Sequence, residues 1–421
     1  MKLSKLKISF ILAAISFRIL LDTSYLNIIS PLYEYSGFLV NLSVARYCLS
    51  WLIYLCAFIF VTARLIKVSD YFFVTALLSI IAPLTSLVGL DSSRSIFPVL
   101  VVVLSIFIIY AITRIKLISF SRLPTIKNGC RIAIFTASLF VVALMFWYYI
   151  AGVKFNLDFS KVYDFRADNA ELSSRGILAY TNNWTYKIFN IFLIGFALHY
   201  KKYLVVVMLV LIQIFFFAAT AHKSVLFLPF LMLGVWFYFR KTNSLVILPL
   251  AFSGIILMTL ASYYLLDDIW LSSLFSRRVF FVPANLTFVY FDFFSQNPQV
   301  LWSNSVFSSF VTYPYDISMT HVVGRYLGKE DMGANNGFIA SGFAHAGLLG
   351  VLFYALIIGF ILRFLNDVTR NLMPIWLAVG LTIVPLRDLL VSSDLFTVML
   401  THGLIVTLIL IYFARAKREF S

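Results

Sequence analysis

Long stretches of apolar residues recur along most of this 421-residue chain, and they limit its possible folds more than any motif does. A membrane-spanning helix needs about 20 predominantly apolar residues. Twelve segments approach that length, at about 8–21, 38–62, 71–90, 96–113, 131–152, 186–200, 203–220, 223–239, 244–266, 337–362, 372–391 and 395–413. The sequence therefore predicts an all-α polytopic membrane protein with about twelve transmembrane helices, in which residues 1–421 form one integral membrane domain.

The composition agrees with this prediction. Hydrophobic residues make up 62% of the chain and charged residues only 12%, whereas soluble proteins carry about 25% charged residues. These values exclude a cytosolic enzyme, a secreted disulfide scaffold and a disordered tail. The three cysteines, Cys48, Cys56 and Cys130, lie in or beside apolar segments. They indicate neither a disulfide framework nor a metal site.

The formal net charge of +15 first suggests a nucleic-acid partner. However, the basic residues are scattered at the ends of the apolar segments, as they are in membrane proteins that follow the positive-inside rule. With twelve spans, every loop on the side of the two termini is basic, and no loop on the other side is strongly so. We therefore expect both termini inside, contacts with membrane lipids and no nucleic-acid partner.

Two long loops are expected on the outer side, at about 153–185 and 267–336. Loops longer than about 15 residues are usually functional or disordered. The second loop is rich in Phe, Tyr and Trp, which makes disorder improbable. We expect it to fold as short helices that lie against the outer membrane surface.

The chain contains neither a P-loop nor a glycine-rich dinucleotide turn. An enzyme that works outside the cell membrane has no access to ATP in any case. Such an enzyme needs a substrate that carries its own energy, and we expect no cofactor.

The pair Arg277 and Arg278 follows an apolar span near the expected bilayer surface. Guanidinium groups bind phosphate oxygens in a bidentate way. The pair is therefore a candidate holder of a lipid-linked pyrophosphate. Alternatively, both arginines bind lipid headgroups or form ion pairs with Asp267 or Asp268.

His222 and Lys223 interrupt two apolar segments at the expected outer surface. Ionisable groups at such a boundary are costly and are functional candidates, here as phosphate contacts. The alternative is a short outer turn whose charge marks the interface. Arg325 in the second loop is a further phosphate candidate, with a solvated loop residue as the alternative.

Two histidines are candidates for a general base. His321 lies in the second outer loop, where an imidazole can accept a proton near neutral pH. His345 lies inside the tenth apolar segment, and it is either a site residue or a packing residue bonded to a neighbouring helix. We interpret His402 as a packing residue, and Arg387 and Asp388 as an ion pair.

A run of mixed charge at about 161–175 lies in the first outer loop. Arg166 in this run is a candidate for binding sugar hydroxyls, and the nearby Trp184 and Tyr186 are candidates for stacking on sugar rings. Such runs are more often solvated surfaces, which is the alternative.

Three short segments, together with the plan of many spans and a large loop before the last three, resemble one family. A segment with Arg278, Pro283, Tyr290, Phe294 and Pro298 is similar to the Arg-containing start of that family's large outer loop. A second similar segment contains Asn335, Asn336, Gly337, Phe338, Gly347 and Gly350, and the third is the polar turn 221–224. The family is the bacterial oligosaccharide repeat-unit polymerases, the Wzy-type polymerases of O-antigen and capsular polysaccharide.

This resemblance implies a glycosyltransferase at the outer face of the bacterial inner membrane. The growing glycan would pass from its undecaprenyl-pyrophosphate carrier to a sugar hydroxyl on a new lipid-linked repeat unit. A polysaccharide chain-length regulator and a flippase would be partners. The expected catalytic residues are His321 and His345. The residues expected to bind substrate or pyrophosphate are Arg277, Arg278, Lys223, Arg325, His222, Asn336 and Arg166.

Two other functions remain open. An O-antigen ligase uses the same donor but transfers the glycan to a lipid A-core acceptor. Its usual His-Asn pair at the end of the large loop is Asn335-Asn336 here, which favours the polymerase. A flippase or other transporter is expected to have charged residues along a path through several spans and no large outer loop.

Overall fold

The computed structural model describes residues 5–115, 119–153, 155–157 and 176–415. Within these ranges the regular structure is helical, and the β-pairing is limited to two isolated bridges. The elements up to residue 114 are α1 (Lys5–Ser24), η1 (Tyr25–Ile29), α2 (Ser30–Tyr33), η2 (Glu34–Ser36), α3 (Val44–Cys56), η3 (Ala57–Phe60), α4 (Val68–Ala76), η4 (Leu77–Ile81), α5 (Ala82–Leu90) and α6 (Phe97–Arg114).

The remaining elements follow a similar pattern, in which several long helices contain a π-helical turn. The middle of the chain forms α7 (Gly129–Ile150), α9 (Leu178–Trp184), η5 (Thr185–Phe189), α10 (Asn190–His199), α11 (Tyr203–Thr220), α12 (Lys223–Phe239), α13 (Ile247–Leu266), η6 (Ser272–Phe281) and α14 (Val282–Gln296). The last part forms α15 (Met319–Tyr326), α16 (Phe338–Thr369), α17 (Ile375–Val391), α18 (Leu395–Leu400) and α19 (Leu404–Ala414).

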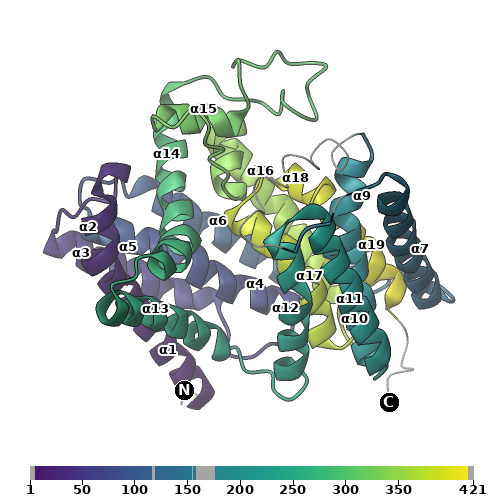
Figure 1. Ribbon diagram of the computed structural model, residues 1–421. Helices are drawn as coiled ribbons and strands as arrows, with labels where there is room; N and C mark the ends of the chain where they lie inside the picture. The colour runs from purple at the N-terminus through teal and green to yellow at the C-terminus, as the bar shows by residue number, and fades with distance from the viewer. Residues whose placement is uncertain (1–4, 116–118, 154, 158–175, 416–421) are drawn as a thin grey trace.

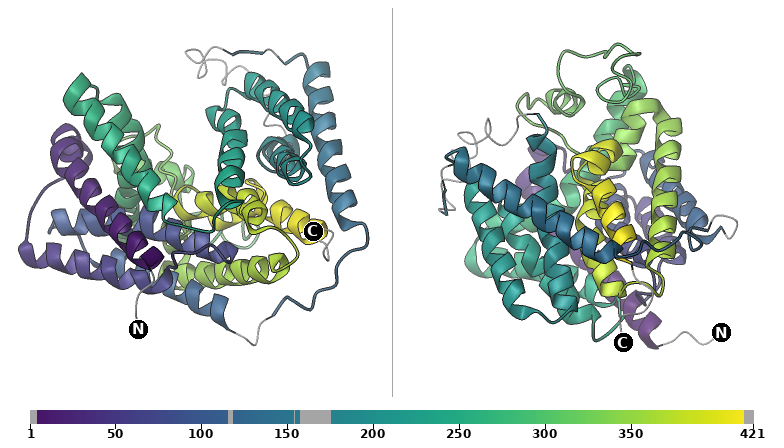
Figure 2. Two further views of the ribbon diagram at one scale, coloured as in Figure 1. Left: turned by 90° about the horizontal axis from the view of Figure 1, so that it is seen from below. Right: turned by 90° about the vertical axis from the view of Figure 1, so that its right-hand side faces the viewer.

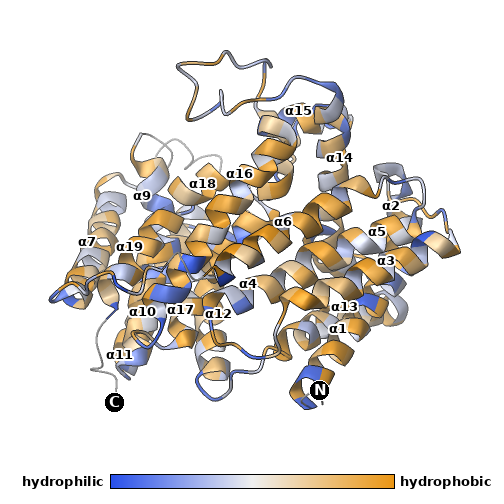
Figure 3. Cartoon of the chain, turned by 180° about the vertical axis from the view of Figure 1, so that it is seen from behind, coloured by the Kyte–Doolittle hydropathy of each residue, from blue (hydrophilic) through white to orange (hydrophobic). Residues whose placement is uncertain are grey.

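Six helices in the described ranges are long and apolar enough to cross a membrane, and several shorter helices are also apolar. The prediction of an all-helical fold is thereby confirmed for the described residues, and these apolar helices support a membrane protein, with six of them long enough to span against the twelve spans expected. Figure 3 shows the apolar character along most helices, with hydrophilic residues in several connecting loops and at the start of α1. The six helices are Val68–Leu90, Phe97–Arg114, Gly129–Ile150, Tyr203–Thr220, Ile247–Leu266 and Phe338–Thr369.

The run α4–η4–α5 extends from the centre of the molecule, where α4 lies, to α5 beside α3 (Figure 1). Every residue from Val68 to Leu90 is buried, as expected for a helix that is apolar on all sides. One group of helices, α1, α3, α13 and α14, lies on one side of this centre, and α7 and α9–α12 lie on the other. The long helix α16 packs against α6 and α14, and α17 packs against α12 and α4.

The start of α1 and the end of α19 lie away from α15 (Figures 1 and 2). The loop that precedes α15 projects from the opposite end together with α15 itself. The two ends of the helical assembly therefore differ in character, since only one of them carries this large loop.

The segment 267–336 is more helical than expected. Instead of short surface helices alone, it contains one unbroken helix formed by η6 and α14, from Ser272 to Gln296. Nine residues of α14 are buried, and the Phe291 ring stacks on Phe343 of α16 with ring centres 3.9 Å apart. This helix packs inside the assembly because its sequence is apolar on nearly all sides, and neighbouring helices must cover those side chains.

A buried ion pair joins α1 to its neighbours. Arg18 Nη1 lies 2.9 Å from Asp22 Oδ2, and the side chains are 0% and 6% exposed. The guanidinium carbon of Arg18 lies 5.1 Å from the centre of the Trp51 ring of α3, and Ser86 of α5 donates a hydrogen bond to Asp22. Arg18 is therefore neutralised inside the protein and does not extend toward a membrane interface.

Candidate functional site

A cavity of about 750 Å³ lies where α4, η5, α12, α17 and the turn between α18 and α19 meet. We call it the Asp388 cavity. Its polar lining consists of Tyr71, Thr75, Lys187, Ser224, Asn335, Arg387, Asp388, Ser392, Ser393, Thr397 and His402. Its apolar lining consists of Leu228, Leu231, Phe252, Ile383 and Val384. A cavity with this mixture inside an apolar helical assembly is a strong candidate for a binding site.

The turn between α18 and α19 brings His402 to this cavity. Gly403 has a left-handed backbone (φ 78°) and lies directly before α19. A Cβ atom at Gly403 would lie 2.9 Å from Ile188 Cγ1 and 3.1 Å from Trp184 Cδ1. In addition, Trp184 Nε1 donates a 2.6 Å hydrogen bond to the carbonyl of Leu400. The interrupted helix is therefore fixed against α9 and η5, and irregular backbone at such a depth is typical of a cavity lining.

Lys187 lies in the π-helical turn η5. A π-helical turn carries an extra residue within a helix and is frequent at functional sites. Pro385 interrupts the hydrogen bonds of α17 just before Arg387 and Asp388. Local irregularities in three different helices thus surround the same cavity.

Asp388 is the centre of the charged groups. His402 Nδ1 lies 2.8 Å from Asp388 Oδ2, and Arg387 Nη1 lies 2.9 Å from Asp388 Oδ1. Ser392 Oγ donates a 3.2 Å hydrogen bond to the same carboxylate. The Asp388 side chain is 10% exposed, whereas that of Arg387 is 55% exposed. The carboxylate is therefore held in place, and the guanidinium remains available to a ligand.

The cavity carries a net positive charge. Lys187 and Arg387 are two basic side chains, and Asp388 is the only carboxylate among the lining residues. Two cations around one carboxylate favour the binding of an anion, and the apolar surroundings strengthen the attraction. Phosphate or diphosphate groups are suitable ligands.

The contact of His402 with Asp388 is suited to proton transfer. The negative charge of a carboxylate this close to one imidazole nitrogen stabilises the imidazolium that forms when the other nitrogen accepts a proton. The side chain of His402 is 18% exposed, so its ring is accessible from the cavity. Among the described residues, no group of three or more His, Cys, Asp or Glu side chains is arranged to bind a metal ion.

His345, a predicted base, lies in a buried network outside this cavity. Its Nδ1 accepts a 3.2 Å hydrogen bond from the backbone N–H of Trp302, and its Nε2 lies 3.2 Å from Asp394 Oδ2. Tyr354 donates a 2.6 Å hydrogen bond to Asp394 and accepts one of 2.7 Å from Trp302 Nε1. Both nitrogens of His345 are therefore engaged, which corresponds to the packing alternative.

This network attaches the large loop to a kink in α16. The backbone of α16 is non-helical at Ala346 and Gly347. The carbonyls of Ala344 and His345 accept 2.9 Å hydrogen bonds from the backbone N–H groups of Val300 and Leu301. The loop thereby satisfies two carbonyls beside the kink, and it lies next to the α17–α18 turn that lines the Asp388 cavity.

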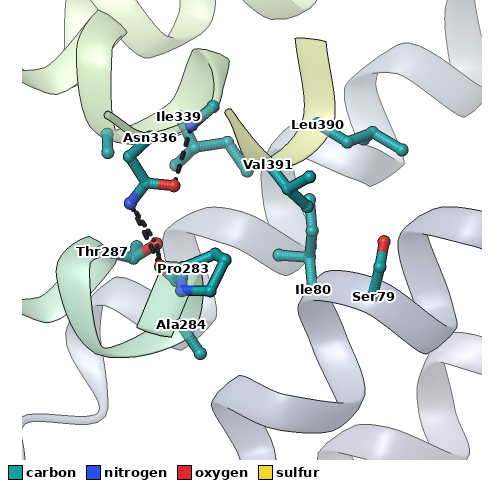
Figure 4. Close-up of a pocket in the computed structure, with 11 residues that line it drawn as sticks. Ser79, Ile80, Pro283, Ala284, Thr287, Asn336, Ile339, Leu390 and Val391 are labelled. Atoms are coloured by element: carbon teal, nitrogen blue, oxygen red, sulfur yellow. Dashed lines mark hydrogen bonds between the residues drawn. The ribbon is translucent and has the colours of Figure 1, made fainter. Parts of the chain in front are cut away.

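Asn336, another predicted ligand, connects α14 to the start of α16 (Figure 4). Its Nδ2 donates 3.1 Å hydrogen bonds to the Pro283 carbonyl and to Thr287 Oγ1. Its Oδ1 accepts a 2.8 Å hydrogen bond from the backbone N–H of Gly337. Figure 4 shows Leu390 of α17 across the same small space. The Asn336 amide therefore positions helices, whereas its neighbour Asn335 lines the Asp388 cavity.

The other predicted residues are distributed over several places. Arg277 lines a second cavity, and Arg278 is exposed. Lys223 begins α12, next to Ser224 of the Asp388 cavity, and His222 precedes it. The structure thus separates the two adjacent arginines, and it places the 222–224 turn beside the Asp388 cavity.

Two predicted residues of the large loop lie on its surface, and one lies elsewhere. His321 is bonded to Ser318 Oγ at 2.7 Å, and Arg325 forms an exposed ion pair with Asp316 at 3.2 Å. Neither lines the Asp388 cavity. Arg166 lies outside the described residues.

Two ionisable residues of the Asp388 cavity, Lys187 and His402, were not among the predicted site residues, and Arg387 and Asp388 were predicted only as an ion pair. That pair is present, but it also faces His402 and a cavity. The sequence did contain a pattern that marks these residues as candidates, because each of these ionisable side chains interrupts an apolar segment, where a charge costs free energy. Their proximity was not predictable, since it depends on how distant helices pack.

Comparison with known proteins gave no relative: no family model, no curated protein and no solved structure matches this chain.

Proposed function

We propose that this protein polymerises oligosaccharide repeat units linked to undecaprenyl pyrophosphate, and that the Asp388 cavity is the site of glycan transfer. The observation that carries the proposal is the contact between His402 and Asp388 in a cavity with two cations, Lys187 and Arg387. The cavity thereby combines a base with an anion-binding group, which are the two requirements for transfer from a diphosphate donor.

The cations act on the donor. Lys187 and the exposed guanidinium of Arg387 bind the diphosphate that links the growing glycan to its lipid. When the bond between the sugar C1 and the phosphate oxygen breaks, negative charge develops on the diphosphate. Two fixed cations in apolar surroundings stabilise that charge and lower the barrier.

His402 acts on the acceptor. The hydroxyl of the sugar on a new lipid-linked repeat attacks C1 of the donor sugar, and the free nitrogen of His402 accepts the hydroxyl proton. Asp388 stabilises the imidazolium at 2.8 Å. One C–O bond forms as one breaks, undecaprenyl pyrophosphate leaves, and the lengthened glycan remains on the acceptor lipid.

The proposed membrane arrangement supplies the substrates. Twelve spans with both termini inside place the large loop and α15 at the outer face of the bacterial inner membrane, where a flippase delivers lipid-linked repeats. The position of α15 away from the start of α1 and the end of α19 is consistent with that orientation. A chain-length regulator is the expected protein partner.

The reaction is testable with purified protein in nanodiscs and a synthetic lipid-linked repeat unit. We expect His402→Gln to lower polymerisation about 10²–10⁴-fold, since general base catalysis contributes a factor of that size. His321→Gln is the matched control and should keep its activity, because His321 lies on the loop surface. Full activity of His402→Gln, or loss only in His321→Gln, would reject the assignment.

Gene deletion followed by a gel of surface glycan separates this function from the two alternatives. Lipid A-core with a single repeat unit supports the polymerase. Core without any repeat, together with accumulated lipid-linked polymer, identifies a ligase. Single repeats trapped inside the cell identify a flippase.

A further inference from the structure

A second polar cavity, of about 660 Å³, lies at the end of the molecule that carries α15. We call it the Arg94 cavity. It is formed by η2, the loop between α5 and α6, η6, α14 and the segment after α15. Its charged and amide side chains are Asp91, Arg94, Arg277, Asn285, Asp292 and Lys329. None of these residues lines the Asp388 cavity.

Arg94 is rigidly held in this cavity. Its Nε donates a 3.1 Å hydrogen bond to Asp91, and its Nη1 donates one of 2.8 Å to Asn285 Oδ1. Its Nη2 donates to the carbonyl of Gly37, and its guanidinium carbon lies 5.1 Å from the centre of the Phe288 ring. A cation held by contacts with three segments of the chain is preorganised and loses little entropy when it binds an anion.

Arg277 provides the observation that indicates a ligand. Its guanidinium carbon lies 4.3 Å from the centre of the Tyr33 ring, which orients the group. Its Nε is buried and has no hydrogen-bond partner among the described residues. A guanidinium group that the protein leaves without an acceptor on this nitrogen favours an anion nearby, and the cavity that Arg277 lines has room for one.

The charges of the Arg94 cavity favour an anion. Three cations, Arg94, Arg277 and Lys329, line it together with two carboxylates. Asp91 is already paired with Arg94 at 3.1 Å, so Arg277 and Lys329 exceed the remaining carboxylate, Asp292. Guanidinium groups beside an ammonium group are well suited to a diphosphate.

The Arg94 cavity and the Asp388 cavity share a structural connection. The helix α14 carries Asn285 of the first cavity, and Asn336 binds the same helix at Pro283 and Thr287. The adjacent Asn335 lines the Asp388 cavity. The distance between the two cavities is therefore fixed by one short and well-bonded junction.

We propose that the Arg94 cavity binds the diphosphate group of a second lipid-linked oligosaccharide, the acceptor, while the Asp388 cavity holds the donor. The diphosphate site itself follows from the three cations that line the cavity, and its assignment to the acceptor rests on the proposed polymerase function. A polymerase of this kind must hold two diphosphate lipids at once, and the protein has two separate cation-lined cavities.

The test measures binding without turnover. Wild-type protein in phosphatidylcholine nanodiscs is titrated with radiolabelled inorganic pyrophosphate and with a short-chain prenyl diphosphate. We expect two sites in the wild type. We expect Arg277→Met to weaken one site about 10–100-fold, the loss of one charge-assisted hydrogen bond. Lys329→Met should weaken the same site and serves as a second variant if Arg277→Met does not fold.

Arg325→Met is the matched control, because it removes the same charge from the loop surface outside the cavity. A single site in the wild type, or unchanged binding in both cavity variants, overturns the proposal. Equal competition by nanodiscs that contain phosphatidylglycerol also overturns it, since the cavity would then bind ordinary lipid headgroups. Because no glycan is transferred in this assay, a failure of the polymerase function leaves the binding result intact.

Discussion

The substitution Gly403→Ala tests how the turn before α19 places His402 in the Asp388 cavity. Gly403 combines a left-handed backbone with a close approach to α9 and η5. Gly152→Ala is the matched control. Gly152 also has a positive φ, of 63°, but a Cβ atom there meets nothing within 4 Å.

The magnitude follows from two separate costs. A left-handed backbone costs a residue with a Cβ atom about 1–2 kcal/mol, and this cost applies to both variants. At Gly403 the new methyl group also overlaps Ile188 Cγ1 at 2.9 Å, and overpacking adds about 1–3 kcal/mol. The entropy that alanine removes from the unfolded chain is the same in both variants and cancels. We expect losses of about 2–5 kcal/mol for Gly403→Ala and about 1–2 kcal/mol for Gly152→Ala.

Equilibrium unfolding in detergent micelles gives the two free energies of unfolding, and the polymerisation assay gives the functional effect. Gly403→Ala should lower activity more than Gly152→Ala, because only the first displaces His402. Equal losses of stability in the two variants would refute the packing argument. Full activity of Gly403→Ala despite the expected destabilisation would refute the link between the turn and the site.

The remaining predictions concern buried polar groups. Arg18→Met should lower the free energy of unfolding by about 3–5 kcal/mol, because Asp22 remains buried and loses its cation. The double variant with Asp22→Leu should recover most of this loss in the same measurement. Tyr354→Phe should cost about 1–3 kcal/mol by removing the donor to Asp394. Burial by itself raises the pKa of Asp394. The contacts of its carboxylate with His345, with Tyr354 and with the backbone N–H of Phe396 outweigh burial, so the pKa of Asp394 lies below its ordinary value. The stabilisation by Asp394 is therefore complete above about pH 4, and it is lost as the pH falls through the lower pKa of the folded state. In acid titrations of the free energy of unfolding, Asp394→Asn should abolish this loss of stability at low pH.

The sequence predicted some parts of the site and not others for identifiable reasons. Arg277 was selected as an anion-binding residue from its type and position, and it does line a cation-rich cavity. His345 was selected because it interrupts an apolar segment, yet the same rule applied to His402, which was assigned to packing. An ionisable group inside an apolar segment needs a partner. The sequence does not show whether that group and its partner belong to a buried hydrogen-bond network, as His345 does, or line a cavity, as His402 does.

By itself, the sequence determined that this is a helical membrane protein, because the length and spacing of the apolar segments leave no other way to satisfy the backbone away from water. It also determined where charge interrupts those segments. Only the tertiary structure decided which of these charged side chains lie close together. Lys187, Asp388 and His402 come from η5, α17 and the α18–α19 turn. Their proximity depends on the packing of α9–η5 against that turn and of α17 against α12. Such packing is set by the shapes of many side chains together, which no local pattern encodes.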